Sequence, residues 1–196
     1  GVAVAVLSRP GIPVSEAGRA RKLARDANEF GAQVVRDHST RFGLFATLPL
    51  FDVEGSLQEI AHGYDVLTAD GVCFSTSYGN KWIGDPTFAP VMDELNRRRA
   101  VAFVHPSAPG FVNEDLMLEP GSVRGKSGVQ PAALEFMFDS ARSIVSLMLN
   151  GVLYRCPNIR FIFCHGGGTL PYIHERLNHL IGEDPLPDEE WTTDRK

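Results

Sequence analysis

Short runs of apolar, β-branched and aromatic residues alternate along this chain with longer stretches in which apolar positions follow a helical period. The apolar runs predict five buried strands, at 2–7, 43–48, 72–74, 101–104 and 159–163. The helical stretches predict helices over 15–30, 52–68, 88–98 and 131–149, and one more after Thr169. Because the strands are continuously apolar and do not alternate with polar residues, we expect an α/β fold with a parallel sheet covered by helices on its outer face.

Residues typical of helix ends refine these boundaries. Ser15 and Asp52 are expected to cap the first two helices, Gly31 to end the first, and Pro131 to lie in the first turn of the fourth. The connection over 106–130 is rich in proline and glycine, and loops of that length are usually functional or mobile. It leaves the end of a predicted strand, so it is a candidate cover for a site. The acidic, proline-rich segment 182–196 is expected to be a flexible tail.

Composition narrows the class of protein. The 196 residues are 43% hydrophobic, which is enough for one core and favours a single domain. The net charge of −5 and the scattered acids argue against nucleic acid or an anionic membrane as a partner, and the arginine run 97–99 is expected to be a solvated helix end. No apolar run approaches the roughly 18 residues that a membrane helix needs, so we expect a soluble, cytoplasmic protein.

The three cysteines, Cys73, Cys156 and Cys164, form no CxxC pair. Their number is odd and most lie in apolar contexts. This pattern predicts reduced, buried thiols that serve packing, in preference to disulfides or a thiolate metal site.

Two histidines end predicted strands. His105 follows four apolar residues and precedes a proline, and His165 follows another apolar run and precedes three glycines. The carboxyl ends of parallel strands are where α/β folds place their sites, and imidazole is the commonest metal ligand. Each histidine has a plainer alternative: His105 as a hydrogen-bonded core residue, and His165 as an incidental part of a tight turn.

Other polar residues point more weakly to chemistry. His174 and His179 are five apart on the last helix and therefore on different faces, so both are expected at the surface. His38 and His62 lie in polar loop and helix contexts and are not favoured as functional residues. Asp139 and Arg142 are three apart on one helix and are expected to form a solvated ion pair.

Several short motifs, in one order along the chain, resemble the amidohydrolase superfamily, in the branch of the aminocarboxymuconate-semialdehyde and 6-methylsalicylate decarboxylases. The matching stretches are RFGLFATLP at 41–49, ADGV at 69–72, GDP at 84–86, VHP at 104–106, FD at 138–139 with Arg142, and HGGGTLP at 165–171. The resemblance runs through nearly the whole chain to about residue 180.

The resemblance implies a (β/α)8 TIM barrel with one divalent metal ion, zinc or alternatively manganese, at its C-terminal face. His105 matches the metal ligand of the fifth strand. His165 matches the sixth-strand histidine that transfers a proton beside a metal-bound water. Arg176 matches an arginine that reaches the carboxylate substrate of a neighbouring subunit, which implies a homodimer.

The chain departs from this family pattern at two metal-ligand positions. It has neither the H-x-H or E-x-H pair of the first strand nor the aspartate of the eighth, and its five strand–helix units fit the second to sixth of a barrel. We therefore expect residues 1–196 to be a barrel domain that is incomplete at both ends. One histidine cannot hold a catalytic metal, so the chain by itself is expected to bind zinc or manganese weakly.

Three functions follow as expectations. The first is a metal-dependent decarboxylase of a small aromatic or unsaturated carboxylic acid, with His165 in proton transfer. The second is a hydrolase of a lactone or amide that uses the same metal centre. The third is a truncated, inactive paralogue that acts as an interaction module.

Overall fold

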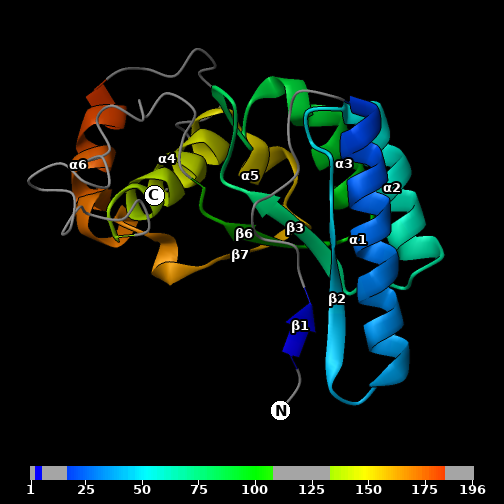
Figure 1. Ribbon diagram of the computed structural model, residues 1–196. Helices are drawn as coiled ribbons and strands as arrows, with labels where there is room; N and C mark the ends of the chain where they lie inside the picture. Colours follow the sequence, from blue (N-terminus) through cyan, green and yellow to red (C-terminus); the bar gives the residue numbers. More distant parts are fainter. Residues whose placement is uncertain (1–2, 6–16, 108–132, 184–196) are drawn as a thin grey trace, which may run out of the picture.

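The computed structural model describes residues 3–5, 17–107 and 133–183 (Figure 1). Its main sheet has five parallel strands in the order β1-β2-β3-β6-β7. The strands are β1 (Ala3–Ala5), β2 (Phe42–Thr47), β3 (Gly71–Ser75), β6 (Val101–His105) and β7 (Arg160–Phe163). All five predicted strands are therefore confirmed as parallel neighbours.

Six α-helices accompany these strands in the described residues. They are α1 (Ala17–Asp37), α2 (Val53–Asp65), α3 (Ala89–Arg97), α4 (Glu135–Leu149), α5 (Val152–Arg155) and α6 (Leu170–Glu183). The pattern did not predict the short α5, nor the small hairpin of β4 (Ser77–Tyr78) and β5 (Lys81–Trp82). Elements of two to four residues are too short to show a period.

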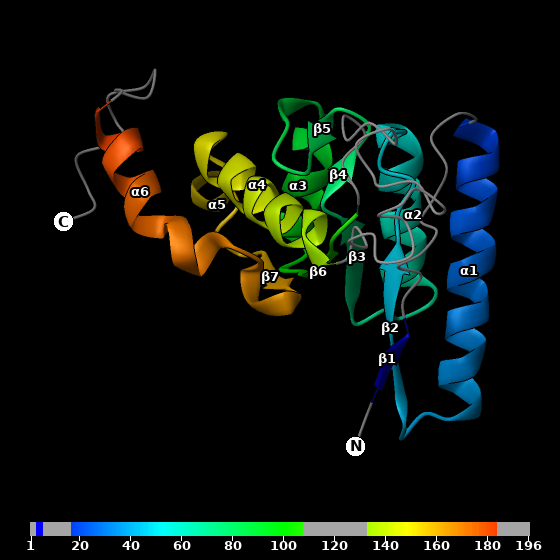
Figure 2. The same ribbon diagram turned by 60° about the vertical axis from the view of Figure 1, so that its left-hand side comes forward.

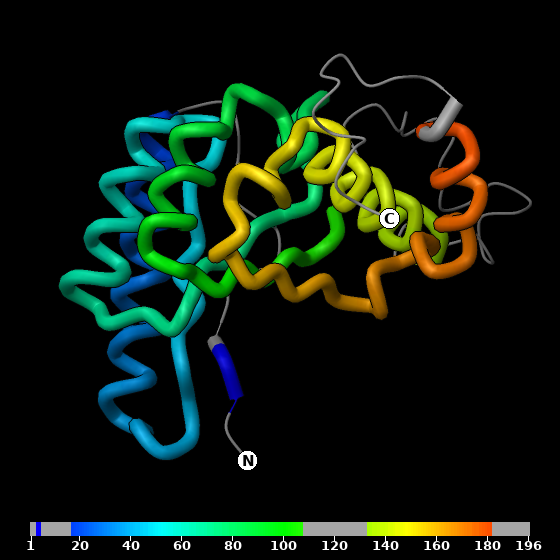
Figure 3. Tube along the Cα trace, turned by 180° about the vertical axis from the view of Figure 1, so that it is seen from behind, coloured from blue at the N-terminus to red at the C-terminus, as the bar shows by residue number. Residues whose placement is uncertain are grey.

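The strand order follows the order of the chain, which identifies the architecture. When every parallel crossover moves one strand in the same direction with the same hand, the helices fall on one face and the sheet curls toward a barrel. Figures 1 and 2 show this arrangement, with α1 and α6 at opposite ends of the curled sheet. The same order is easily followed from behind in the tube of Figure 3. The described chain is therefore part of an α/β barrel, as expected.

Helix boundaries test the predicted caps. Asp52 caps α2, because its carboxylate accepts a hydrogen bond from the Gly55 amide at 2.9 Å. The prediction that Gly31 ends the first helix is wrong, since α1 continues to Asp37. A side chain at this position would approach Leu44 of β2 to 2.7 Å, so glycine serves close packing of helix on sheet. Ser15 and Pro131 lie outside the described residues.

The core lies between the sheet and its covering helices. The largest fully buried side chains come from β3, β6, α3 and the segments beside them, and include Phe74, Phe88, Ile83, Met92 and Leu95. A buried polar contact ties the first helix to this core: the Asn28 amide donates to the Thr47 carbonyl at 3.0 Å and to Glu59 at 2.8 Å. Because its side-chain amide is hydrogen-bonded to both partners, Asn28 fixes α1 against both β2 and α2.

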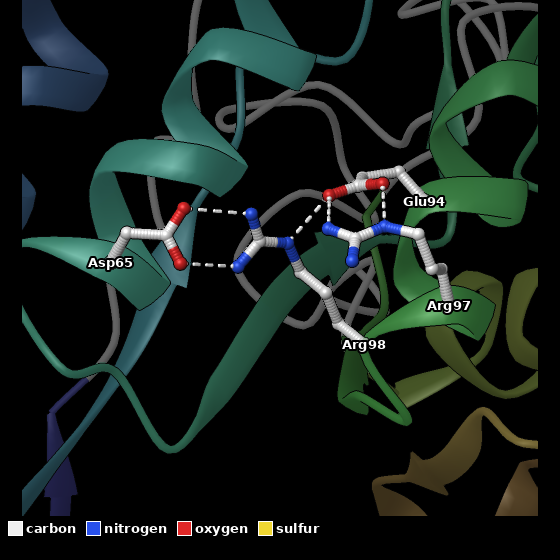
Figure 4. Close-up of polar contacts among 4 residues, drawn as sticks. All are labelled: Asp65, Glu94, Arg97 and Arg98. Carbon is white, nitrogen blue, oxygen red and sulfur yellow. Dashed lines mark hydrogen bonds and ion pairs between the residues drawn. The ribbon is translucent and has the colours of Figure 1, made fainter.

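The arginine run does end a helix, as predicted, but it is not simply solvated. Arg98 donates two hydrogen bonds to Asp65 of α2, at 2.7 and 2.8 Å, and one to Glu94 of its own helix at 2.6 Å (Figure 4). Arg97 donates two more to Glu94, both at 2.7 Å. The side chain of Arg98 is only 14% exposed. These ion pairs therefore join α2 to α3.

This network predicts a pH-dependent stability. Hydrogen bonds from Arg97, with further help from Arg98, lower the pKa of Glu94 to about 2. A carboxylate whose folded pKa is depressed stabilises the fold above its unfolded pKa, and this contribution is lost as the pH falls toward the folded value. We expect Glu94→Gln to lower the Tm at pH 7, and the difference from the parent to shrink between pH 5 and about 2.

Thermal unfolding followed by circular dichroism across that pH range measures the effect. Glu54→Gln, at an exposed glutamate of α2, is the matched control and should leave the Tm nearly unchanged. A Tm difference for Glu94→Gln that is constant with pH contradicts the assignment.

The expected long loop and the expected tail lie mostly in segments that the structure does not describe. The connection at 108–132 and the segment 184–196, which contain most of the expected loop and tail, lie outside the described residues. Among the helices that the structure does describe, none combines the length and apolar character needed to cross a membrane.

Candidate functional site

The two strand-end histidines meet at the C-terminal edge of the sheet. The imidazole centroids of His105 and His165 are 5.9 Å apart, with the rings inclined at 70°. They meet because β6 and β7 are paired in parallel, with Val104 opposite Phe163, so both strands end at the same level. The predicted approach of these two residues is confirmed.

The surroundings of His105 determine which ring nitrogen carries its proton. The residue closes β6 and is half-buried, and its Nδ1 lies 2.9 Å from the Pro106 carbonyl oxygen. A carbonyl can only accept, so Nδ1 carries the proton in this contact and the lone pair of a neutral ring is on Nε2. Metal-ligating histidines are commonly held in this way by a backbone carbonyl. The tautomer of His105 therefore suits a metal ligand.

His165 has an unusual backbone. Its φ is +52°, in the left-handed region that non-glycine residues rarely adopt, and it opens a short 3-10 turn, η4 (His165–Gly167). The side chain is exposed. Such conformations cost free energy and often occur at functional sites. The turn thus presents the imidazole to solvent beside His105.

The glycines after His165 allow a helix to approach. A side chain at Gly168 would lie 2.1 Å from the Met137 carbonyl oxygen of α4, and the next amide, of Thr169, donates to that same oxygen at 3.1 Å. Gly168 also has a φ of +68°. Gly168 is therefore required for α4 to support the turn that carries His165.

Cys164 is a third ligand-type residue at this edge. Its Sγ and the ligand nitrogens of His105 and His165 all lie within 4.8 Å of one another, and this trio is the one such group among residues 3–5, 17–107 and 133–183. The thiol donates to the Val104 carbonyl at 3.2 Å, and burial raises its pKa. The structure confirms Cys73, Cys156 and Cys164 as free thiols.

Sequence reasoning treated all three cysteines as packing residues, which holds for the buried Cys73 and Cys156 but is incomplete for the half-buried Cys164. The sequence did offer one signal that Cys164 lies at the site: it directly precedes His165. His105 and Cys164 lie at the ends of adjacent parallel strands and in the same row of the sheet. Only the pairing of the strands reveals this neighbourhood.

The structure places Arg176 in the second turn of α6, with an exposed side chain. Its position soon after the glycine turn is as expected, while a role in binding substrate remains a prediction. His174 and His179 are exposed, as expected, and His174 pairs with Glu175 at 3.1 Å.

Asp139 was misjudged from sequence. It is fully buried, and the expected solvated ion pair with Arg142 is wrong, because Arg142 instead lies 3.8 Å from Glu135. The Asp139 carboxylate accepts from Trp82 Nε1 at 2.8 Å, Thr76 Oγ1 at 2.5 Å and Ser77 Oγ at 3.0 Å. Its partners are distant in sequence and lie beyond the end of β3, next to His105.

Known proteins resemble this chain along most of its length. A family model described as Amidohydrolase matches residues 3–191. Decarboxylase macB of Penicillium terrestre is 34% identical over 192 residues, covering 95% of this chain and 55% of that protein. The 6-methylsalicylic acid decarboxylase of Penicillium expansum is 33% identical over 175 residues, covering 88% of this chain and 51% of that protein.

A solved structure has the same fold. The 5-carboxyvanillate decarboxylase of Novosphingobium aromaticivorans, complexed with manganese and 4-hydroxy-3-methoxy-5-nitrobenzoic acid, superposes with a TM-score of 0.81 at 24% identity. The match covers 93% of this chain and 50% of that one. The chain thus spans about half the length of the relatives that it matches.

Proposed function

This chain belongs to the amidohydrolase family, and from that premise we propose that it forms the central part of a metal-dependent decarboxylase of a small aromatic carboxylic acid. The observation that carries the proposal is the convergence of His105 and His165, with ring centroids 5.9 Å apart, at the edge where this fold places its sites. The two relatives above, both decarboxylases, match across this same region.

A single divalent cation fits the residues present. The protonated Nδ1 of His105 leaves Nε2 as its ligand atom. One ring nitrogen of His105, one of His165 and the Sγ of Cys164 lie within 4.8 Å of one another, so further donors are near. Such donors suit zinc, whereas the solved neighbour is complexed with manganese. We propose His105 as one protein ligand. When bound, the cation would supply Lewis-acid stabilisation of negative charge on the acid.

His165 is the proposed proton donor. Loss of carbon dioxide breaks one carbon–carbon bond and leaves an electron pair on the ring carbon, which must then gain a proton. A protonated imidazole carries an N–H on each ring nitrogen, so the His165 ring can hold that proton and deliver it. The exposed turn that carries His165 leaves its ring accessible to a substrate.

The complete gene product that contains this chain provides the test. Carbon dioxide release should be measured with a panel of 2-hydroxybenzoates, and hydrolysis with lactones and amides, each with zinc and with manganese. Metal-dependent decarboxylation that is lost in His105→Ala supports the proposal. Hydrolysis without decarboxylation favours the hydrolase alternative, and the absence of all turnover favours an interaction module; either result overturns the proposal.

Arg176 gives a prediction about substrate binding. We propose that the gene product is a homodimer in which this exposed arginine binds the substrate carboxylate across the subunit interface. Guanidinium matches a carboxylate with two parallel hydrogen bonds, which lysine cannot reproduce. Arg176→Lys should therefore raise the KM for the acid by about tenfold or more, with metal content unchanged.

Steady-state kinetics and metal analysis of the purified variant measure this effect. Arg36→Lys, at an exposed arginine of α1, is the matched control. An unchanged KM for Arg176→Lys, or a dimer structure with Arg176 far from the subunit contact, contradicts the assignment.

A further inference from the structure

Thr76 has no part in the proposed reaction, yet it holds the chain on both sides of Pro106, the residue after His105. It follows β3 directly, and its amide donates to the His105 carbonyl at 3.0 Å, which continues the pairing of β3 with β6 beyond Ser75. Its hydroxyl accepts a hydrogen bond from the Ser107 amide, also at 3.0 Å. One fully buried residue therefore holds the backbone of the two neighbours of Pro106.

The partners of the Thr76 hydroxyl determine the direction of its hydrogen bonds. The Asp139 carboxylate can only accept, so the hydroxyl donates to it, at 2.5 Å. The Ser107 amide can only donate, and it takes a lone pair of the same hydroxyl oxygen. The hydroxyl thus connects a buried carboxylate of α4 to the peptide group between Pro106 and Ser107.

That peptide group also contacts the ring of His105. The Ser107 amide and the Pro106 carbonyl belong to one planar unit, and the carbonyl accepts from His105 Nδ1 at 2.9 Å. Because the unit is planar, holding its N–H also fixes the direction of its C=O. Hydrogen bonds in such a chain polarise one another, so the carboxylate strengthens the carbonyl as an acceptor. A stronger acceptor holds the proton on Nδ1 and makes Nε2 a better ligand atom.

We propose that Thr76 is a positioning residue for His105, through which the Asp139 carboxylate acts on the imidazole by way of the Pro106–Ser107 peptide. The inference deepens the proposed function and rests on it, because it takes His105 as a metal ligand. Carboxylates that bind metal-ligating histidines directly orient the ring and raise its basicity. In this chain a hydroxyl and a peptide group connect the carboxylate to the ring.

The affinity of the complete gene product for Zn²⁺ tests the inference, with a competing chelator to give the dissociation constant. Thr76→Val removes the hydroxyl and keeps the shape of the side chain. We expect it to weaken Zn²⁺ binding about tenfold or more, as the loss of a group that orients a ligand does. Thr76→Ser restores the hydroxyl and should bind Zn²⁺ within about threefold of the parent.

Ser77→Ala is the matched control. Ser77 Oγ donates at 3.0 Å to the same Asp139 oxygen that Thr76 binds. Its contact with Ser107 joins the two hydroxyls, at 3.2 Å, and leaves the peptide amide to Thr76. Ser77→Ala should therefore keep the Zn²⁺ affinity of the parent within about threefold. Circular dichroism compares the fold of each variant with that of the parent. Thr76→Val that binds Zn²⁺ as tightly as Ser77→Ala overturns the inference.

A second measurement needs no variant at position 76. In the zinc-loaded parent with isotopically labelled histidine, nuclear magnetic resonance should show the proton of His105 on Nδ1, and His105→Ala identifies its signals. A proton on Nε2 of His105 overturns the inference, even where Thr76→Val does not fold.

The His105→Ala variant separates this inference from the proposed function. If it binds Zn²⁺ as tightly as the parent, His105 is not a ligand and both are overturned. If it loses the ion while Thr76→Val binds like Ser77→Ala, the role of Thr76 alone is refuted. The expected pattern of Zn²⁺ affinities in a gene product that decarboxylates no acid supports the role of Thr76 and refutes the proposed function.

Discussion

Replacing His165 with asparagine in the complete gene product is expected to lower kcat for decarboxylation by about 100- to 10,000-fold, the usual contribution of a positioned general acid or base. Asparagine is close to histidine in size and, like it, tolerates the left-handed backbone, with φ at +52°, that position 165 requires. The variant should therefore fold normally. The loss would come from the proton that asparagine cannot carry.

Two further variants make this result specific. His105→Ala should lose both activity and bound manganese, because His105 is the proposed metal ligand, whereas His165→Asn should lose activity and keep manganese. His174→Asn, at an exposed histidine of α6, should change neither. Steady-state kinetics and elemental analysis of the manganese-loaded proteins provide both readouts. Full kcat in His165→Asn removes this residue from the mechanism.

The sequence was sufficient for the sheet because its strands are continuous apolar runs separated by helical ones. The strand that ends at His105 and the strand before His165 could both be found, and the parallel arrangement then required their ends to meet. The order of the strands, β1-β2-β3-β6-β7, agrees with the barrel that the family resemblance implied. Local pattern thus determined the strands of the main sheet and their common edge.

What the sequence could not show depends on contacts between distant residues. Gly31 has the usual appearance of a helix end, and only the packing of Leu44 against it explains why a glycine lies inside α1. Cys164 has the context of a packing thiol until strand pairing places it beside His105. Asp139 has a nearby arginine in sequence but takes its partners from 57 to 63 residues away. No local pattern carries such information.

The partners of Asp139 explain how the end of β6 is held. Thr76 Oγ1 donates to Asp139 at 2.5 Å and also accepts from the Ser107 amide at 3.0 Å. The Thr76 amide in turn donates to the His105 carbonyl at 3.0 Å. A single buried carboxylate of α4 therefore holds Thr76, which in turn binds the backbone of His105 and of Ser107. The same helix supports the glycine turn of His165 through Met137, so α4 sets the positions of both histidines.

Asp139→Ala is consequently expected to be among the most destabilising single substitutions in this chain, by about 3–5 kcal/mol in the free energy of unfolding. Alanine removes the shared acceptor of the buried Thr76 hydroxyl and of the half-buried Ser77 and Trp82 donors, and a buried group left unsatisfied costs about 1–3 kcal/mol. Asp139→Asn should cost less, because the amide oxygen can still accept while its NH2 group replaces an acceptor with a donor.

Urea denaturation of the parent and the two variants measures these differences, with Asp37→Ala as the control. Asp37 ends α1 at an exposed position, so its loss should change stability by about 0.5 kcal/mol or less. The free energy of unfolding should be highest for the parent and Asp37→Ala, lower for Asp139→Asn, and lowest for Asp139→Ala. An Asp139→Ala protein within about 1 kcal/mol of the parent contradicts the role given to this carboxylate, because the buried Thr76 hydroxyl and two half-buried donors would then have lost their shared acceptor at almost no cost.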